Sequence, residues 1–462
     1  MSSVGNLLSL GRTALLSHQS RMETVQNNIA NASTPGYRRQ RVELTTLGGA
    51  YANPELRGVQ VGAQESVRAP FIDRQLAHHR GEFGYQAARI EAESIVEAAL
   101  NPGNGQDLAS QVDSFFSSLR NLSSNPSGAI ERQDFIESAQ EMTRRFSRTR
   151  KAMADQQDQI FTGMQARVDS LNGDLEQIAQ LDGRIKQAVQ AGQHAGELID
   201  KRDRLIAGVS EQISVDVVPR EAGTIQLIDK SGAALVEAGK ARTLQVERTA
   251  AGELQLLLDG GAAAPRKLDT PGGGLGGLLD SHNELLAGQI ADLDQLAYDF
   301  ANEFNAVHGA GVGTDGVGGR DFFVPLGSPD GAARNLQVSS LVTTNPDALA
   351  TAADPAGVPG GNGNIEQMLT LQDAALSSGN TLRQGSRGVA IAVGKSVASA
   401  SNMAEAASAS LAQLESLEAS VSGVSLEEEM VAMTQAQRAF EASMKLIQVG
   451  DEMFDTILSI KR

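Results

Sequence analysis

The feature that most constrains the fold is an apolar repeat shared by the first and last helices of this 462-residue chain. In the last helix the repeat falls on every seventh residue, at Leu426, Met433, Phe440, Ile447 and Phe454. In the first helix it falls on Leu8, Leu15, Met22 and Ile29. Such a repeat is typical of a helix that packs lengthwise against another helix. We therefore expect the two ends of the chain to pair as a helical stalk.

A second, less complete apolar seam accompanies each repeat. It comprises Met430, Met444 and Leu458 in the last helix, and Val4 and Val25 in the first, where Gly11 and His18 are weak points. The last helix also has a typical start, because Ser425 and Glu428 have the spacing of a capping box. These features predict that both terminal helices pack along a partner.

Opposite net charges favour the same pairing. Residues 1–45 carry five Arg and two Glu, whereas residues 420–462 carry seven acidic and four basic side chains. On periodicity alone, an alternative stays open in which both helices are ordinary amphipathic elements of one globular core. The basic run at residues 38–41 could form an anion site, but a solvated face or a match for the acidic last helix explains it more simply.

Composition argues against several classes of function. A net charge of −17 argues against nucleic-acid binding, which needs a basic surface. The absence of cysteine excludes disulfides and thiolate chemistry. We expect no membrane span, because no apolar run is long enough, and no cleaved secretory signal within residues 1–20. We also expect no cofactor.

Three local patterns suggest chemistry, but each has a simpler explanation. Adjacent His78 and His79 point in different directions and lack a third ligand nearby, so we reject a metal site. Residues 271–277 contain G-x-G-x-x-G without a preceding buried strand, which favours a hinge over a nucleotide site. The charged string at residues 197–206 fits ion pairs along an exposed helix face better than catalysis.

Periodicity divides the middle of the chain. Residues 38–82 are predicted to be irregular and extended, and residues 84–200 to be helical. Each of Gly163, Gly173 and Gly183 costs about 1 kcal/mol inside a helix, so we expect a helical hairpin or a bent helix there. From residue 214 the period changes to two, which predicts antiparallel strands.

The expected fold class is α+β, mainly α. It combines coiled-coil-like terminal helices, a discontinuous helical bundle and one inserted small antiparallel β domain. The expected ranges are 1–45 and 420–462 for the stalk, 46–209 and 271–419 for the bundle with a loop at 309–363, and 210–270 for the β domain.

Two strings resemble the terminal motifs of the bacterial flagellar axial family, which includes rod, hook and hook-associated proteins. After the first helix, the motif residues are Asn28, Asn31, Thr34, Pro35, Gly36 and Tyr37. Near the other end, residues 433–442 resemble the C-terminal motif, although Phe440 stands where the family more often has Tyr. By physics alone, the first string predicts only the end of a helix followed by a turn.

Residues 197–206 and 275–308 resemble, above other members, a hook-associated protein that joins hook to filament. The resemblance weakens after Phe323, where longer members insert a β domain, and we expect that domain to be absent or reduced to a loop. It implies a structural, non-enzymatic protein of the extracellular flagellum. Such a protein leaves the cell uncleaved through the type III export channel and assembles as a helical tube.

The resemblance also implies partners: further copies of the chain, the hook protein, an adjacent junction protein and a cytoplasmic export chaperone. We expect the chaperone to bind Phe440, Ile447 and Phe454. The first helix has few apolar seam positions, so we expect the stalk to be disordered before assembly. Two alternatives remain: a hook or rod subunit, and a binding or enzymatic module displayed on the flagellum at residues 210–270.

Overall fold

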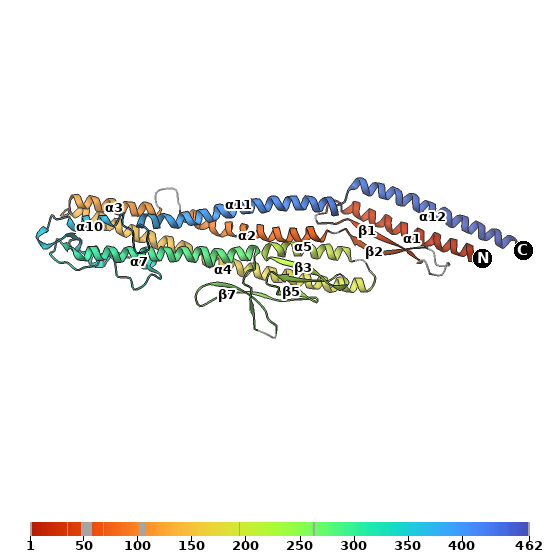
Figure 1. Cartoon of the computed structure of the whole chain (residues 1–462), viewed down its shortest axis with the longest axis horizontal. Helices are drawn as coiled ribbons and strands as arrows, with labels where there is room; N and C mark the ends of the chain where they lie inside the picture. The colour runs from red at the N-terminus through yellow and green to blue at the C-terminus, as the bar shows by residue number, and fades with distance from the viewer. Residues whose placement is uncertain are drawn as a thin grey trace.

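The structure is a computed structural model, and it describes residues 2–34, 36–47, 58–67, 69–100, 107–193, 195–261 and 264–460. The molecule is long and narrow, with a helical bundle at one end and a two-helix stalk at the other (Figure 1). Both chain termini lie at the free end of the stalk. The mainly helical fold with small antiparallel sheets confirms the predicted fold class.

The stalk pairs α1 (Ser2–Asn31) with α12 (Leu426–Ile460), as the shared repeat predicts. The helices are antiparallel, because a methyl group added at Gly11 would lie 2.8 Å from Ile447 Cγ1, and one added at Gly450 would lie 2.8 Å from Leu8 Cδ2. An antiparallel hairpin of β1 (Gln40–Leu47) and β2 (Gly58–Ser66) packs against α1. The stalk therefore has a third component that periodicity did not reveal.

Helical structure in the bundle begins earlier in the chain than the predicted residue 84. Helix α2 (Pro70–Leu100) starts within the region predicted to be extended, with proline at its first position. Proline suits that position because its missing N–H has no helical partner there. Helix α2 packs lengthwise against α11 (Leu382–Ser422), a partner far away in sequence. The bundle is completed by α3 (Leu108–Ser124), α5 (Gly196–Gln212) and α10 (Gly363–Thr370).

Helix α4 (Ala129–Gln190) is one continuous helix of 62 residues, so the expected hairpin is wrong. A methyl group added at Gly163, Gly173 or Gly183 would meet nothing within 4 Å, so these glycines mark open surface. The opposite face is buried along most of the helix, from Phe135 to Ile185. Burial of that face outweighs about 1 kcal/mol per glycine.

Two small antiparallel sheets follow α5 and pack against α4. The first sheet contains β3 (Val215–Pro219), β4 (Ile225–Asp229), β5 (Ala234–Glu237) and β6 (Lys240–Ala241). The second contains β7 (Leu244–Arg248), β8 (Leu254–Leu258) and β9 (Arg266–Lys267). Alternate residues of β4 and β8 are buried, which confirms the predicted period of two. The 3-10 turn η1 (Glu221–Gly223) lies between β3 and β4. Two other 3-10 turns, η3 (Pro346–Ala348) and η4 (Pro355–Gly357), occur later in the chain.

The glycine-rich segment is not the expected hinge, because it begins helix α6 (Gly273–Asp280). A methyl group added at Gly277 would collide with the backbone of Tyr85, and one added at Gly273 would lie 2.6 Å from the carbonyl carbon of Gln212. The glycines therefore allow α6 to approach α2 and α5 closely. A π-helical turn, η2 (Ser281–Leu286), then leads into α7 (Ala287–Ala310).

Residues 309–363, expected to be a loop, contain several short elements. These are β10 (Val312–Gly313), α8 (Ala332–Asn335), α9 (Ser340–Thr344) and β11 (Ala350–Ala352). The segment is anchored by Phe322 and Phe323, whose rings pack against Phe304 with centroids 5.1 and 5.5 Å away. All three side chains are fully buried. This aromatic cluster therefore joins the segment to α7.

Replacing Phe304 with alanine tests this cluster. We expect Phe304→Ala to lower the free energy of unfolding by about 3–5 kcal/mol, because it leaves a cavity among fully buried rings. Urea unfolding followed by circular dichroism measures the change. Ile130→Ala is the control, because Ile130 is 74% exposed and its loss should cost less than about 0.5 kcal/mol. Equal losses of unfolding free energy in the two variants would contradict the proposed role of Phe304 as a buried anchor.

Stability is also expected to depend on pH through His308, which is fully buried at the end of α7. Its Nδ1 lies 2.8 Å from the Arg320 carbonyl, and its Nε2 accepts a hydrogen bond from the Ala350 N–H at 3.1 Å. Burial lowers the pKa of His308, because the neutral ring fits this site and the charged ring does not. Burial likewise lowers the pKa of His282.

Because the folded protein resists protonation, the unfolded chain binds more protons below about pH 6.5. The free energy of unfolding should therefore decrease as pH falls from about 7 toward 5. In His308→Gln this slope should become shallower, as measured by urea unfolding at several pH values. His78→Gln should keep the slope, since the His78 side chain is 51% exposed. If the slope in His308→Gln were unchanged, buried His308 would not be the source of the pH dependence of the unfolding free energy.

Candidate functional site

The loop after α1 crosses the connection between α11 and α12, and we call this crossing the elbow (Asn28, residues 36–40 and residues 422–429). The Arg39 N–H donates to the Ser422 carbonyl at 2.8 Å, where α11 ends. Gly36 turns the loop with φ of 73°, and a methyl group added there would lie 3.1 Å from Arg204 Cδ. Glycine is therefore favoured by both backbone conformation and space.

Asn28 is the centre of the elbow and is 1% exposed. Its Nδ2 donates to the Gln40 carbonyl and to Glu429 Oε2, each at 3.0 Å. Its Oδ1 accepts from the Gln40 N–H and from the Tyr37 hydroxyl, each at 3.0 Å. All four hydrogen bonds that an amide side chain can make are therefore formed. Asn28 thus connects α1, the loop and α12.

Glu429 is a buried carboxylate that depends on its partners, because its side chain is only 2% exposed. Arg39 Nε donates to Glu429 Oε1 at 2.7 Å, and another nitrogen of Arg39 donates to Glu428 at 2.7 Å. Burial, together with nearby carboxylates that include Glu429, raises the pKa of Tyr37 to about 12. The Tyr37 hydroxyl therefore keeps its proton and remains a donor to Asn28.

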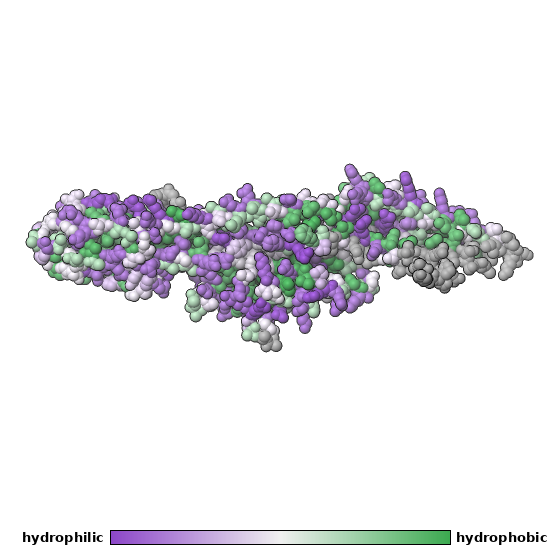
Figure 2. Space-filling model, viewed as in Figure 1, coloured by the Kyte–Doolittle hydropathy of each residue, from purple (hydrophilic) through white to green (hydrophobic). Residues whose placement is uncertain are grey.

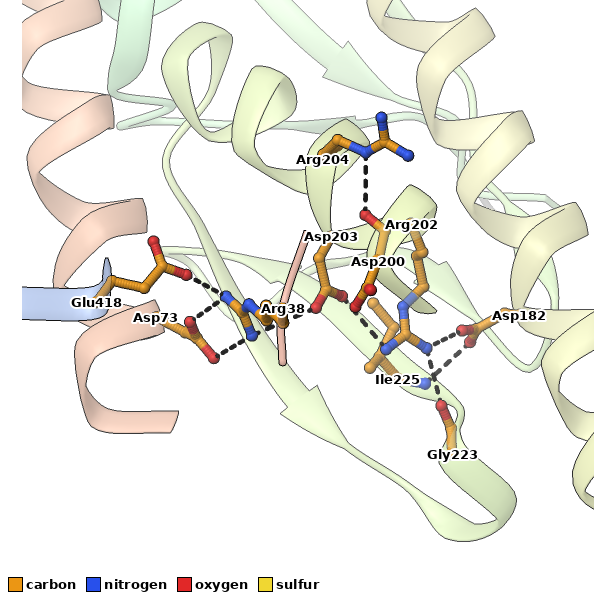
Figure 3. A network of polar contacts seen from close by, with 10 residues as sticks. All are labelled: Arg38, Asp73, Asp182, Asp200, Arg202, Asp203, Arg204, Gly223, Ile225 and Glu418. Atoms are coloured by element: carbon orange, nitrogen blue, oxygen red, sulfur yellow. Dashed lines mark hydrogen bonds and ion pairs between the residues drawn. The ribbon is translucent and has the colours of Figure 1, made fainter. Parts of the chain in front are cut away.

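Arg38 fastens the same loop to the bundle (Figure 3). It binds both oxygens of Asp73 on α2, at 2.5 and 3.1 Å, and Glu418 on α11 at 2.6 Å. Asp203 on α5 lies 3.7 Å away. Burial disfavours the charged guanidinium, but the hydrogen bonds and charges of these carboxylates outweigh it and raise the pKa of Arg38. One side chain therefore joins three helices.

A second ion pair lies to the right of Arg38 in Figure 3 and is more deeply buried. Arg202 donates to Asp182 at 2.7 Å and to the Gly223 carbonyl at 2.8 Å, and Asp182 also accepts from the Ile225 N–H at 2.9 Å. Arg202 and Asp182 are 4% and 0% exposed. The expectation that the charges of residues 197–206 form an exposed face is therefore wrong for Arg202. The Arg202–Asp182 pair connects α4, α5 and the first sheet.

The predicted stalk residues lie along the interface to different degrees. Leu8, Leu15, Met22, Ile29, Met433, Phe440 and Ile447 are partly buried. Leu426 and Phe454, at the two ends of α12, are 52% and 41% exposed. The structure thus brings the middle of the repeat against α1 and leaves its ends open.

The expected second seam of α12 is wrong, because Met430 and Met444 are 65% and 51% exposed; the Leu458 side chain lies outside the described residues. The buried positions are instead Glu429, Ala436, Ser443 and Gly450, also seven apart. On α1, Gly11 allows close contact with Ile447 and is not a weak point. Val25 is buried as expected, whereas the Val4 side chain is not described. Small side chains let the helices approach closely.

The N-terminal motif residues divide into two groups. Asn28, Gly36 and Tyr37 form the elbow, as described above. Asn31 and Thr34 form the turn that ends α1, where the Thr34 N–H donates to the Asn31 carbonyl at 2.9 Å. Pro35 lies outside the described residues. The motif therefore has a structural role, in positioning the loop on α12.

The partners of Asn28 and of the adjacent Arg38 and Arg39 were missed by sequence reasoning. They are Asp73, Glu418, Glu428 and Glu429. The only available signal was the opposite charge of the two ends, which favoured the arginine run as a match for acidic helices. Arg39 confirms the predicted match to the acidic last helix, whereas Arg38 pairs with carboxylates of α2, α5 and α11 instead. Arg41 is exposed.

Neither a metal site nor a membrane span is found in the described part of the chain. His78 and His79 both contact Glu82, at 3.2 and 3.0 Å, and within the described ranges no group of three potential ligands could hold a metal ion. No helix among the residues described is long and apolar enough to cross a bilayer. The elbow is therefore the most developed polar site outside the core.

Comparison with protein families identifies the chain. Residues 94–323 match the helical domain of the flagellar hook-associated protein FlgK. Residues 8–38 match the flagella basal body rod protein family, and residues 418–460 match the C-terminal family of flagellar basal body rod FlgEFG proteins. The chain belongs to the bacterial flagellar axial family, among its hook-associated members. It is therefore a structural component of the flagellum and assembles with other flagellar proteins.

Individual relatives agree with this assignment. Flagellar hook-associated protein 1 of Bacillus subtilis is 27% identical over 98% of this chain and 97% of its own length. Its namesake in Salmonella typhimurium is 31% identical over 71% of this chain, which spans only 60% of that protein. The flagellar hook junction protein FlgK of Burkholderia pseudomallei, at 23% identity, shares the fold over 54% of this chain and 46% of its own, with a TM-score of 0.50.

Replacing Asn28 with aspartate tests the elbow. In Asn28→Asp a carboxylate would face Glu429 and lose the two donated hydrogen bonds, which should cost about 1.5–3 kcal/mol locally. Hydrogen exchange of the Arg39 amide should therefore become about 10- to 100-fold faster. Asn31→Asp is the matched control, because the Asn31 side chain donates only to the nearby Asn27 carbonyl. Equal effects in both variants would refute the central role of Asn28.

Proposed function

We propose that this protein joins the hook to the filament as a subunit of a helical tube, with a structural and not a catalytic role. The observation that carries the proposal is the antiparallel stalk of α1 and α12, which Asn28 of the family motif helps to hold together and which Arg38, just after the motif, fastens to the bundle. Support comes from the hook-associated relatives and from the match of the helical domain to FlgK. The chain ends would form the tube and the bundle would lie outside it.

The stalk has the surface that such a tube requires. Helix α12 carries exposed apolar side chains on faces that α1 does not cover: Leu426, Met430, Val431, Met444, Leu446, Val449, Met453 and Phe454. Figure 2 shows hydrophobic residues at the surface of the stalk among hydrophilic ones. Two helices alone cannot bury these faces, so further helices from neighbouring copies would cover them. Contacts that repeat without closing produce a helical tube.

The same surface suggests how premature assembly is prevented. The expected chaperone residues Phe440 and Ile447 are partly buried on the α1 side of α12, and Phe454 is exposed. A chaperone bound to the first two would therefore compete with α1. We propose that the stalk is unfolded during type III export and that α1 displaces the chaperone at the growing flagellum. The hook protein and an adjacent junction protein would then contact the two ends of the tube.

A second candidate is another axial subunit, in the hook or the rod. It is favoured by the family matches of the two terminal segments, which are to rod-type families. The FlgK match over residues 94–323 favours the junction instead. The two candidates differ in the stage at which assembly would stop without the protein.

Deleting the gene in its own bacterium distinguishes these stages. Under the proposed function, electron microscopy should show hooks without filaments, and immunoblots should detect monomeric flagellin in the medium. A plasmid copy of the gene should restore filaments. Loss of hooks would assign the protein to the rod or hook, and normal flagella would contradict both candidates.

A further inference from the structure

A groove of about 540 Å³ lies beside the elbow, between α2, α5 and the first sheet. Its walls include Leu76, Ala77, Ile206, Val215 and Ile225, and Arg38 lines it at the elbow. Figure 3 shows the two arginine networks that border it. The groove is therefore apolar inside and bordered by charge, and nothing in the described stalk or bundle fills it.

Two arginines at the groove have no carboxylate partner among the described residues. Arg74 on α2 is exposed, and Arg220 after β3 donates only to Gln226. By contrast, Arg38 and Arg202 are paired with carboxylates. The exposed Asp216 offsets one of the two free charges. The rim of the groove thus offers two arginines that are available to pair with a carboxylate from outside the described structure.

The chain itself presents a surface with the complementary chemistry. At the start of α12, Leu426, Met430 and Val431 are 52%, 65% and 58% exposed, and Glu427 is exposed beside them. These positions share one side of the helix, because they are spaced by one, four and five residues. We call residues 426–431 the acidic knob. An acidic segment with exposed apolar side chains fits an apolar groove that has unpaired arginines at its rim.

We propose that the groove of one copy receives the acidic knob of a second copy of this chain. The inference rests on the proposed assembly into a tube. Groove and knob lie at the same level of the molecule, because Arg38 lines the groove while its neighbour Arg39 binds Glu428 and Glu429 in the knob. Copies placed side by side around a tube therefore present one surface to the other.

This contact has the geometry that a helical assembly needs. The two surfaces differ, so the contact is heterologous, and every copy has one free groove and one free knob. A chain of such contacts continues without closing into a dimer. It would couple neighbouring copies at the elbow, outside the helices of the tube itself.

Cysteine cross-linking in assembled flagella tests the contact directly, because the chain has no cysteine of its own. Ala77→Cys places a thiol in the groove, and Met430→Cys places one on the knob. In cells that express both single variants in place of the natural protein, mild oxidation should give a disulfide-linked dimer. Each variant alone should give none. A protein that carries both substitutions should give a ladder of longer oligomers.

The matched control pairs Met430→Cys with Ile130→Cys, which is equally well exposed but lies at the far start of α4. It should give no dimer. Flagella that assemble normally without a groove–knob disulfide would overturn the inference and leave the proposed function intact. If the unmodified gene does not restore filaments to the deletion strain, the proposed function fails instead, so the two failures are distinguishable.

Charge reversal provides a second test. Arg74→Glu should lower the yield of the Ala77–Met430 cross-link by up to about fivefold, the upper range for an exposed ion pair. Adding Glu427→Arg should restore the yield, because the charges are then exchanged. Arg148→Glu, at an exposed site on α4, is the control and should change nothing. A yield unaffected by Arg74→Glu, or not restored by the exchange, would contradict the predicted orientation.

Discussion

One buried contact, between Asn28 and Glu429, holds the two ends of the chain together, and the neighbouring Arg38 joins them to the bundle. The Glu429 carboxylate is buried there with Arg39 paired to it and Asn28 donating to it. Removing one partner of a buried charge usually costs more than the pair itself contributes. The elbow is thus a point at which a single register of α1 against α12 is favoured over its neighbours.

The pairing of the chain ends was predictable, but the packing details were not. The repeat from Leu426 to Phe454 correctly predicted a helix that packs lengthwise. The missed seam consists of Ala436, Ser443 and Gly450 beside Glu429. Hydropathy patterns follow large apolar residues, whereas close helix contact also depends on small ones. Met430 and Met444 were assigned to the α1–α12 interface because an exposed apolar side chain looks the same in sequence as a buried one.

Only part of the candidate site was predictable from the sequence, because the remaining contacts depend on residues that are far apart in the chain. A resemblance pointed to Asn28, Gly36 and Tyr37, and their places at the elbow explain why those residue types are needed there. Asp73 and Glu418, the partners of the adjacent Arg38, lie far away in sequence, on helices whose charged residues look solvated. The burial of Arg202 was missed because pairing with Asp182 needs tertiary contacts that no local pattern records. Likewise, α4 remained continuous because burial of one face outweighed three glycines.

The long helix α4 has a mechanical consequence. At 1.5 Å per residue, 62 residues form an unbroken strut of about 93 Å. A bending load on the bundle is carried by continuous backbone hydrogen bonds, which deform little. The elbow, by contrast, is a short loop held by side-chain contacts. Compliance in a rotating flagellum would therefore concentrate at the elbow, where the stalk can yield without bending the bundle.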